Sequence, residues 1–313
     1  MKYGMDVTIV IVSYNVADLL NECIISIKKE TSCEYEIIVV DNNSVDNSME
    51  LLKANHPDVK RIQNVSNVGF AKANNQAFEK AQGSYIFMLN PDTVVLDRAI
   101  DKLVQFMDEH PEAGACGPKV LNYDMSLQPS CHHFPTIAMR FIEHSQLERV
   151  FPKSKIFGRH YMTYWNYDEV KEVDWIRGCS LLLRKTTLEL VGTLDENYFM
   201  YTEETDICYR MNKSGWKVLF FPGAEIVHYW GKSSEVSKKE KGYSPATIKY
   251  LFNTKYYFFK KHYGCVHFVF IKGIDFVFYL LVFIKNIFRK DAEVRRLKLS
   301  YASYVLSLIL FGK

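Results

Sequence analysis

Two short, uninterrupted apolar runs near the start of the chain constrain its fold most strongly. Residues 7–13 read VTIVIVS, and residues 36–40 read EIIVV and end at Asp41. Continuous β-branched runs of this length are typical of strands buried on both faces of a parallel sheet. Residues 17–29, between the two runs, place apolar side chains at a helical spacing. The first forty residues therefore predict a strand, a helix and a second strand.

The same alternation continues along the chain. Helices are predicted at 46–55, 71–81, 97–109 and 204–214, and strands at 59–63, 85–89, 173–184 and 217–221. Residues 122–172 are aromatic-rich and predict irregular structure. Alternating strands and helices favour an α/β fold with a mainly parallel sheet and helices on both faces. Ligands of such sheets bind at the carboxyl ends of the strands.

The charge of the chain is divided unevenly along its length. Of the 39 basic and 36 acidic residues, 23 and 31 fall in residues 1–231, and 16 and 5 fall in residues 232–313. The acidic part would repel a phosphate backbone, so nucleic-acid binding is not expected. The basic part is rich in Phe, Tyr, Leu and Ile, a composition that favours an amphipathic helical tail on an anionic membrane surface. We therefore predict a catalytic-type domain at 1–233 and a membrane-associating tail at 234–313.

The tail is not expected to span a membrane. Its clean apolar runs are short: residues 276–284 lie between Asp275 and Lys285, and residues 299–311 contain three serines. A spanning helix needs about 20 apolar residues. An interfacial helix or helical hairpin fits better, and the alternative is a helix docked on the protein's own core.

The remaining sequence features restrict the compartment and the cofactor. The chain has seven cysteines, no CxxC pair and no recognisable signal peptide, so a reducing, cytoplasmic location is expected. It contains neither GxG nor a complete Walker motif, since Ile226 stands where the first Walker glycine would be. Standard NAD and ATP chemistry is therefore disfavoured.

Carboxylates close two of the predicted strands. Asp41 ends EIIVVD, and Asp92 follows YIFML in the segment Asn90-Pro91-Asp92. A carboxylate in the crevice can accept the imide N–H of a pyrimidine base, which we predict for Asp41. A second can hold Mg²⁺ or Mn²⁺ against a diphosphate, which we predict for Asp92. Alternatively, each is a helix cap or turn former.

Five ordered segments carry a family resemblance. They read TIVIVSYN, EIIVVDNNSVDNS, NVGFAKANNQAF, YIFMLNPDT and FMYTEETDICYRMNKSGW. Together, over residues 6–233, they resemble the inverting family 2 glycosyltransferases. The segment WNYDEVKEVDWIRGCSLLLR is similar to the bacterial rhamnosyltransferase branch. The resemblance implies a Rossmann-like GT-A fold and a nucleotide-sugar donor.

The resemblance also implies a donor site and a metal site. The residues near the nucleotide sugar would be Ser13, Tyr14, Asn15, Asp41, Asn67, Gly69, Phe70, Asn90 and Lys232. Asp92 would be the main metal ligand and His228 a second, for Mn²⁺ or Mg²⁺, and imidazole favours Mn²⁺. For His228 the alternative is a core histidine at a strand end.

The predicted catalytic base departs from the family pattern. The family has Glu-Asp-x-Asp, whereas this chain has Glu203-Glu204-Thr205-Asp206. We predict Glu204 as the base, with Glu203 as the alternative, because the extra methylene changes the reach of the carboxylate. Asp206 is a third candidate, and it could instead cap the helix or orient Arg210.

The acceptor side is predicted from aromatic and cationic residues. Trp165, Trp175 and Tyr167 could stack on a sugar, or could pack beneath a loop. Arg177 and Gly178 lie next to Trp175 in the sequence and are placed near the acceptor.

The function expected from all these features is metal-dependent transfer of L-rhamnose from dTDP-L-rhamnose to a lipid-linked glycan. The reaction would take place at the cytoplasmic face of the bacterial inner membrane, in cell-surface polysaccharide synthesis, with the protein bound peripherally. UDP-galactofuranose, UDP-N-acetylglucosamine and GDP-mannose are alternative donors. A non-catalytic scaffold that binds nucleotide sugar is an alternative of another class.

Overall fold

The computed structural model describes residues 5–229 and 244–312. Its centre is a nine-stranded sheet whose main path runs β3-β2-β1-β4-β10-β6-β11-β5, with β8 paired to β11. The strands of this sheet are β1 (Val7–Ser13), β2 (Tyr35–Asp41), β3 (Lys60–Gln63), β4 (Tyr85–Leu89), β5 (Thr93–Val95), β6 (Ala113–Leu121), β8 (Lys171–Val173), β10 (Ser180–Arg184) and β11 (Lys217–His228). A separate pair joins β7 (Cys131–His132) to β9 (Trp175–Ile176).

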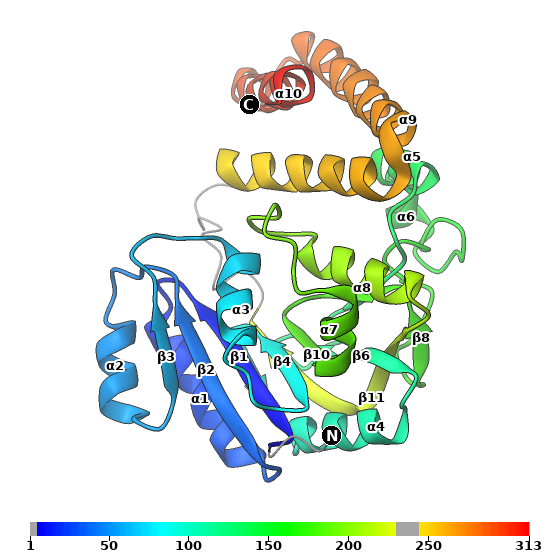
Figure 1. Ribbon diagram of the computed structural model, residues 1–313. Helices are drawn as coiled ribbons and strands as arrows, with labels where there is room; N and C mark the ends of the chain where they lie inside the picture. The colour runs from blue at the N-terminus through cyan, green and yellow to red at the C-terminus, as the bar shows by residue number, and fades with distance from the viewer. Residues whose placement is uncertain (1–4, 230–243, 313) are drawn as a thin grey trace.

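Helices cover both faces of the sheet (Figure 1). One apolar cluster packs α1 (Ala17–Glu30), α2 (Ser48–Asn55) and α4 (Ala99–Glu109) on one face. A second packs α3 (Phe70–Phe78), α7 (Lys185–Val191) and α8 (Glu203–Lys213) on the other. Strands β1 and β2 have no exposed apolar side chain, as their continuous β-branched runs predict. The α/β prediction is confirmed.

Strand β10 gives the sheet its mixed character. It lies between β4 and β6 and is antiparallel to both, whereas β1, β2, β3 and β4 are parallel neighbours. Residue Ser180 at its start pairs with Leu89 at the end of β4. The segment that leads into β10 is therefore brought to the same edge where the parallel strands end.

The region predicted as irregular, 122–172, contains the helices α5 (Ile137–Ser145) and α6 (Leu147–Val150). Thr136 caps α5, because its hydroxyl accepts a hydrogen bond from the Met139 N–H at 3.2 Å. Helix α5 packs against α9, one of the two C-terminal helices (Figure 1).

The C-terminal region consists of two long helices, α9 (Pro245–Ile287) and α10 (Ala292–Phe311). Gly264, with φ 84°, divides α9 into two straight parts. The first part lies across the domain, and the second rises away from it to pair with α10 (Figure 1). The predicted helical tail is confirmed, while the predicted boundary between residues 233 and 234 lies outside the described residues.

By length and composition, α9 is the one helix in the described ranges that could cross a membrane. Runs without any charged residue are shorter than this helix, because Lys272 and Asp275 interrupt its apolar residues. The length of the apolar segment is therefore greater than such runs predict. Asp275 is fully buried against the protein, where it accepts hydrogen bonds from Arg140 at 2.6 Å and from Tyr256 at 2.9 Å. The second part of α9 is thus joined to α5 by a buried ion pair.

Candidate functional site

The site begins at the edge of the sheet where β1, β2 and β4 end. Ser13 and Asp41 are paired at the last register position of β1 and β2. Both are fully buried, and neither Ser13 Oγ nor Asp41 Oδ1 has a hydrogen-bond partner among the described residues. The other oxygen of Asp41, Oδ2, accepts the Ser44 N–H at 3.1 Å. A ligand with an N–H group, such as a pyrimidine base, would satisfy the open acceptor on Asp41.

The predicted neighbours of Asp41 build the surrounding loops. Asn15 accepts the Val45 N–H at 2.7 Å, which ties the loop after β1 to the loop after β2, while Tyr14 is 42% exposed. Asn67 accepts hydrogen bonds from the Asn42 amide at 2.9 Å and from the Gly69 N–H at 3.0 Å. These contacts are internal to the protein, so the side chains of Asn15 and Asn67 shape the cleft through its loops.

Gly69 and Phe70 connect this side of the cleft to the loop before α8. Gly69 has φ 89°, and a Cβ placed on it would come within 2.6 Å of the Phe199 carbonyl oxygen. The Phe70 N–H donates to the same oxygen at 2.6 Å. No other residue type fits this close approach, which joins the start of α3 to the loop that carries the predicted base.

Asp92 and His228 meet because of a long-range strand pairing. His228 is the last residue of β11 and pairs with Thr93 at the start of β5, directly after Asp92. The His228 Nε2 lies 3.3 Å from Asp92 Oδ1. Both side chains are buried or nearly so, and the structure brings these two predicted metal ligands next to each other.

Gln128 fixes the orientation of the His228 ring. Its side-chain amide donates to the His228 carbonyl oxygen at 3.2 Å, so its Oε1, 2.7 Å from His228 Nδ1, is the acceptor. Nδ1 therefore donates to Gln128, and Nε2 is the ring nitrogen directed at the carboxylate of Asp92. A carboxylate oxygen and an imidazole nitrogen at this distance are suited to bind the same divalent cation.

Within residues 5–229 and 244–312, no cluster of three or more metal-ligating His, Cys, Asp or Glu side chains occurs. Asp92 and His228 would supply two ligands to such an ion and would leave positions for water and for phosphate oxygens of a substrate. That is the usual way in which proteins bind Mg²⁺ or Mn²⁺ with a nucleotide. The backbone of Asn90 ties the end of β4 to the turn before β10, because its N–H donates to the Cys179 carbonyl oxygen at 3.0 Å. Lys232 lies outside the described residues.

Glu204 and Asp92 both lie near Cys179. A Cβ on Gly178 would stand 3.6 Å from the Glu204 Cβ, so the turn before β10 touches this side chain. Burial raises the pKa of the Cys179 thiol to about 11, and the charges of Asp92 and Glu204 add to this. The two carboxylates therefore lie near the same buried residue.

Glu203 and Glu204 differ in access. Glu203 is 4% exposed, whereas Glu204 is half-buried. Burial raises the pKa of both carboxyl groups, and the charge of Glu204 raises that of Glu203 further. In each, one oxygen has no hydrogen-bond partner among the described residues. A raised pKa and a buried oxygen without a partner are properties of a general base. Of the two residues, Glu204 is the one recorded beside Gly178, in the predicted acceptor segment.

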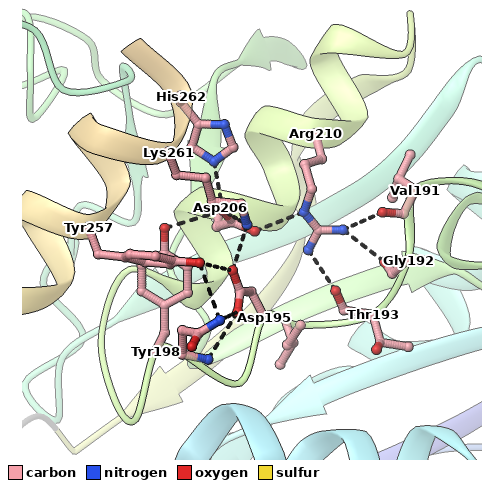
Figure 2. A network of polar contacts seen from close by, with 12 residues as sticks. Val191, Gly192, Thr193, Asp195, Tyr198, Asp206, Arg210, Tyr257, Lys261 and His262 are labelled. Atoms are coloured by element: carbon pink, nitrogen blue, oxygen red, sulfur yellow. Dashed lines mark hydrogen bonds and ion pairs between the residues drawn. The ribbon is translucent and has the colours of Figure 1, made fainter. Parts of the chain in front are cut away.

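Asp206 faces away from this cleft and holds α8 to α9 (Figure 2). It is fully buried and accepts hydrogen bonds from Arg210 at 2.8 Å, from Lys261 at 2.7 Å and from His262 at 2.7 Å. Burial alone would raise its pKa, but these hydrogen bonds and the charge of Arg210 hold it well below the ordinary aspartate value. Of the roles predicted for Asp206, the structure favours the pairing with Arg210 and not catalysis.

The cleft loop before α8 is held by the same helix. Tyr201 and Thr202 both have a left-handed backbone, with φ 72° and 76°, a conformation that costs free energy for residues other than glycine. The Thr202 hydroxyl donates to that of Thr254 in α9 at 3.1 Å. Lys261 also contacts Asp195 at 2.7 Å (Figure 2). The C-terminal helix is therefore part of the support of the predicted base.

The predicted acceptor residues separate into two groups. Trp165 and Tyr167 are buried, stacked on one another at 4.3 Å and packed edge-on against Phe220. Both side chains are therefore packing residues, as the alternative prediction had it. The prediction that Trp165 stacks on a sugar is not supported, because its ring is buried among other aromatic side chains. Trp175 and Arg177 are half-buried and lie with Gly178 on the segment that reaches Glu204.

His132 links Trp175 to Arg177 and was not singled out from the sequence. Its ring stacks on Trp175 at 4.3 Å, and its Nε2 accepts a hydrogen bond from Arg177 Nε at 3.0 Å. Burial, together with the charge of Arg177, holds the pKa of His132 well below its ordinary value, so the ring is neutral. Nothing local in the sequence signals this contact, because β7 and β9 are more than forty residues apart.

Comparison with known proteins is consistent with this arrangement. The model of the family described as glycosyl transferase family 2 matches residues 8–180. The chain is 27% identical over 237 residues to N-acetylglucosaminyl-diphospho-decaprenol L-rhamnosyltransferase of Mycobacterium tuberculosis, covering 72% of this chain and 76% of that protein. It is 26% identical over 260 residues to rhamnosyltransferase WbbL of Escherichia coli, covering 78% of this chain and 92% of that protein.

Two solved structures share the fold. Mannosyltransferase PcManGT from Pyrobaculum calidifontis, in complex with GDP-Man and Mn²⁺, superposes with a TM-score of 0.57 at 16% identity, over 99% of this chain and 88% of that one. GalNAc-T7 with UDP, GalNAc and Mn²⁺ gives a TM-score of 0.57 at 17% identity, over 82% and 51%. The fold is of the GT-A type.

Proposed function

The chain belongs to glycosyl transferase family 2, and from this premise we propose that it transfers L-rhamnose from dTDP-L-rhamnose to a lipid-linked glycan at the cytoplasmic face of the bacterial inner membrane. That it is a glycosyltransferase follows from the family and its relatives. The donor and acceptor are suggested by the relatives named as rhamnosyltransferases, one of which has a diphospho-decaprenol acceptor in its name. The observation that carries the proposal is the approach of His228 to Asp92 at 3.3 Å, with Glu204 near the same buried residue, Cys179, as Asp92.

In this mechanism the nucleotide binds at the ends of β1 and β2, and Asp41 Oδ1 accepts the N–H of the base. Asp92 and His228 would hold a divalent ion, which when bound would neutralise charge on the leaving diphosphate. Glu204 takes the proton of the acceptor hydroxyl as its oxygen bonds to the anomeric carbon. The bond from that carbon to the diphosphate breaks on the opposite face, which inverts the configuration.

A panel of nucleotide sugars tests this proposal. We expect dTDP-L-rhamnose to raise the melting temperature by several degrees in the presence of Mn²⁺ and little without it. A ligand at a hundred times its dissociation constant adds about 2.7 kcal/mol to the free energy of unfolding. Asp92→Asn should abolish the shift with Mn²⁺, because a neutral amide replaces the charged ligand, whereas the exposed Asp97→Asn should not.

A larger shift with UDP-galactofuranose, UDP-N-acetylglucosamine or GDP-mannose would replace rhamnose with that sugar. Binding of a donor without transfer to any glycan acceptor would contradict the proposed reaction and favour a scaffold.

We further propose that the C-terminal helices bind the membrane surface. The second part of α9 exposes large apolar side chains, among them Val269, Phe270, Val277 and Leu281, each more than half exposed. Basic residues flank them in and between the two helices: Lys272, Lys285, Arg289, Lys290, Arg295 and Arg296. An apolar face with a basic border is the composition of an interfacial helix.

Replacing Phe270, Val277 and Leu281 with serine should weaken binding to phosphatidylglycerol-containing vesicles by more than about tenfold, because each side chain loses apolar area that lipid would bury. Vesicle sedimentation measures this. The matched control replaces Ile25 and Leu190, exposed on the catalytic domain at 51% and 73%, and should bind as the wild type does. Unchanged binding by the triple variant would contradict the proposed membrane face.

A further inference from the structure

A cavity of about 460 Å³ opens beside α5, on the acceptor side of the molecule. We call it the α5 cavity. Its size is in the range of sites for small ligands. It is lined by His133, Phe134, Thr136, Ala138, Met139, Ile142, Lys155, Ile156, Arg159 and Asp174. None of these residues belongs to the donor or metal site described above.

The lining combines an apolar surface with two unsatisfied cations. Phe134, Met139, Ile142 and Ile156 supply the apolar surface. Lys155 and Arg159 are exposed, and neither has an ion-pair partner in the part of the chain that the structure describes. Such a combination is suited to a ligand that carries a phosphate group on a hydrocarbon chain, since Arg and Lys bind phosphate by charge-assisted hydrogen bonds.

The carboxylate in the cavity does not cancel this positive charge for a ligand. Asp174 Oδ2 already accepts the Phe134 N–H at 2.7 Å and lies 3.1 Å from His133 Nδ1. Its charge is thus directed at the wall of the cavity. The two cations remain available to an anionic group.

The α5 cavity is connected to the predicted base by one short segment. Asp174 lines the cavity, β9 follows it, and Gly178 touches Glu204. Four residues of extended chain span at most about 13 Å. That length accommodates one sugar ring and a diphosphate, and Trp175 and Arg177 lie along it.

The opposite wall leads to the C-terminal helices. Helix α5 packs on α9 on both sides of Gly264: Arg140 bonds to Asp275, and Glu143 lies 3.6 Å from the Lys255 ammonium. The second part of α9 then carries the exposed apolar side chains proposed to face lipid. A hydrocarbon chain that leaves the α5 cavity along α5 would therefore lead toward α9, the helix proposed to face lipid.

We propose that the α5 cavity binds the diphosphate and first isoprenoid units of the lipid-linked acceptor, with Lys155 and Arg159 on the diphosphate. This inference rests on the proposed function for the acceptor class. It assigns specificity for the lipid carrier to a place distinct from the donor cleft. Bulk phospholipid is the less suited occupant, because the cavity is aligned with the segment that reaches Glu204.

The first experiment compares Lys155→Ala/Arg159→Ala with Arg149→Ala/Lys153→Ala, a pair of exposed cations from the same region that do not line the cavity. Two acceptors with the same sugar are used, one on a farnesyl diphosphate and one on an alkyl chain without phosphate. We expect the cavity variant to raise KM for the diphosphate acceptor at least tenfold. Its kcat, its KM for donor and its KM for the alkyl glycoside should stay unchanged, as should all constants of the control. Equal changes for both acceptors, or no change, would overturn the inference.

The second experiment measures binding of farnesyl diphosphate by calorimetry, with dTDP and Mn²⁺ present to fill the nucleotide site. The wild type and the control should bind it, and the cavity variant should bind at least tenfold more weakly. Ala138→Trp, at an exposed position of the wall, should also weaken farnesyl diphosphate. If phosphatidylglycerol vesicles displace farnesyl diphosphate from the wild type and bind it with equal affinity, the cavity is a phospholipid site and the inference is overturned.

The two experiments separate the inference from the proposed function. Normal transfer with an unchanged KM in the cavity variant would be compatible with the proposed function and would refute binding of the acceptor diphosphate in the α5 cavity. Farnesyl diphosphate binding that depends on Lys155 and Arg159, in a protein that transfers sugar to no acceptor, would support the cavity and refute the function.

Discussion

Replacing Glu204 with glutamine should lower kcat by about 10²–10⁴-fold, the usual contribution of a general base. Glutamine keeps the shape and the contact with Gly178 but cannot take a proton. Donor binding should not change, because Asp41, Asp92 and His228 are intact. Steady-state kinetics together with the donor-induced melting shift will measure both properties.

The matched control is Glu203→Gln, one residue away on the same helix. Glu203 is almost fully buried, so this change should reduce kcat much less than the change at Glu204. Glu204→Asp, which restores the residue usual in the family, should retain part of the activity. If Glu203→Gln abolishes transfer while Glu204→Gln does not, the base is Glu203.

The pH profile of kcat/KM provides an independent check on the base. Burial raises the pKa of Glu204 above the ordinary glutamate value of 4.5. A base acts in its ionised form, so activity should be lost as the pH falls through this raised pKa and be retained above it. An acidic limb at or below 4.5 would contradict assignment of the base to Glu204.

Replacing Asp206 with alanine should lower the free energy of unfolding by about 3–5 kcal/mol, the range measured when one partner of a buried ion pair is removed. The change leaves Arg210 and His262 without the carboxylate that they share, while Lys261 keeps its contact with Asp195. Urea denaturation monitored by fluorescence will measure it. The control Tyr198→Phe removes only the 3.2 Å hydrogen bond from the Tyr198 hydroxyl to Asp206 and should cost about 1 kcal/mol.

The dependence of the free energy of unfolding on acid pH should also report the contribution of Asp206. The folded-state pKa of Asp206 is depressed, so its contribution is fully present above the unfolded aspartate value of about 3.9 and is lost as the pH falls below it toward the folded value. The Asp206→Ala variant should lack this part of the acid dependence. A loss of under 1 kcal/mol at neutral pH would show that the network contributes little to stability.

The sequence predicts those strands and helices whose residues carry a local pattern of apolar side chains. The β-branched runs give β1 and β2 correctly, with bounds within one residue, because burial on both faces leaves a local pattern. Asp41 and Asp92 at strand ends follow from the same reasoning. His228 was placed by family resemblance alone, since its approach to Asp92 depends on the pairing of β11 with β5.

The features that the sequence did not predict are all long-range. The antiparallel position of β10 leaves no local pattern, because strand direction is not encoded in side-chain alternation. Arg210 lies four residues from Asp206 and was recognised, but Lys261 and His262 come more than fifty residues later. The ion pair that joins α5 to α9 links Arg140 to Asp275, 135 residues later.

The two ionic clusters on α9, Asp206 with Lys261 and His262 and Asp275 with Arg140, lie on either side of Gly264. An enzyme tethered by a flexible linker samples many distances from the membrane, whereas a helix fixed at two points holds one. If α9 binds a bilayer, these two attachments would hold the site at a fixed distance from the membrane surface. Under the proposed function, only an acceptor whose reactive hydroxyl lies at that height would be modified, so the fold would select how many sugars the glycan already carries.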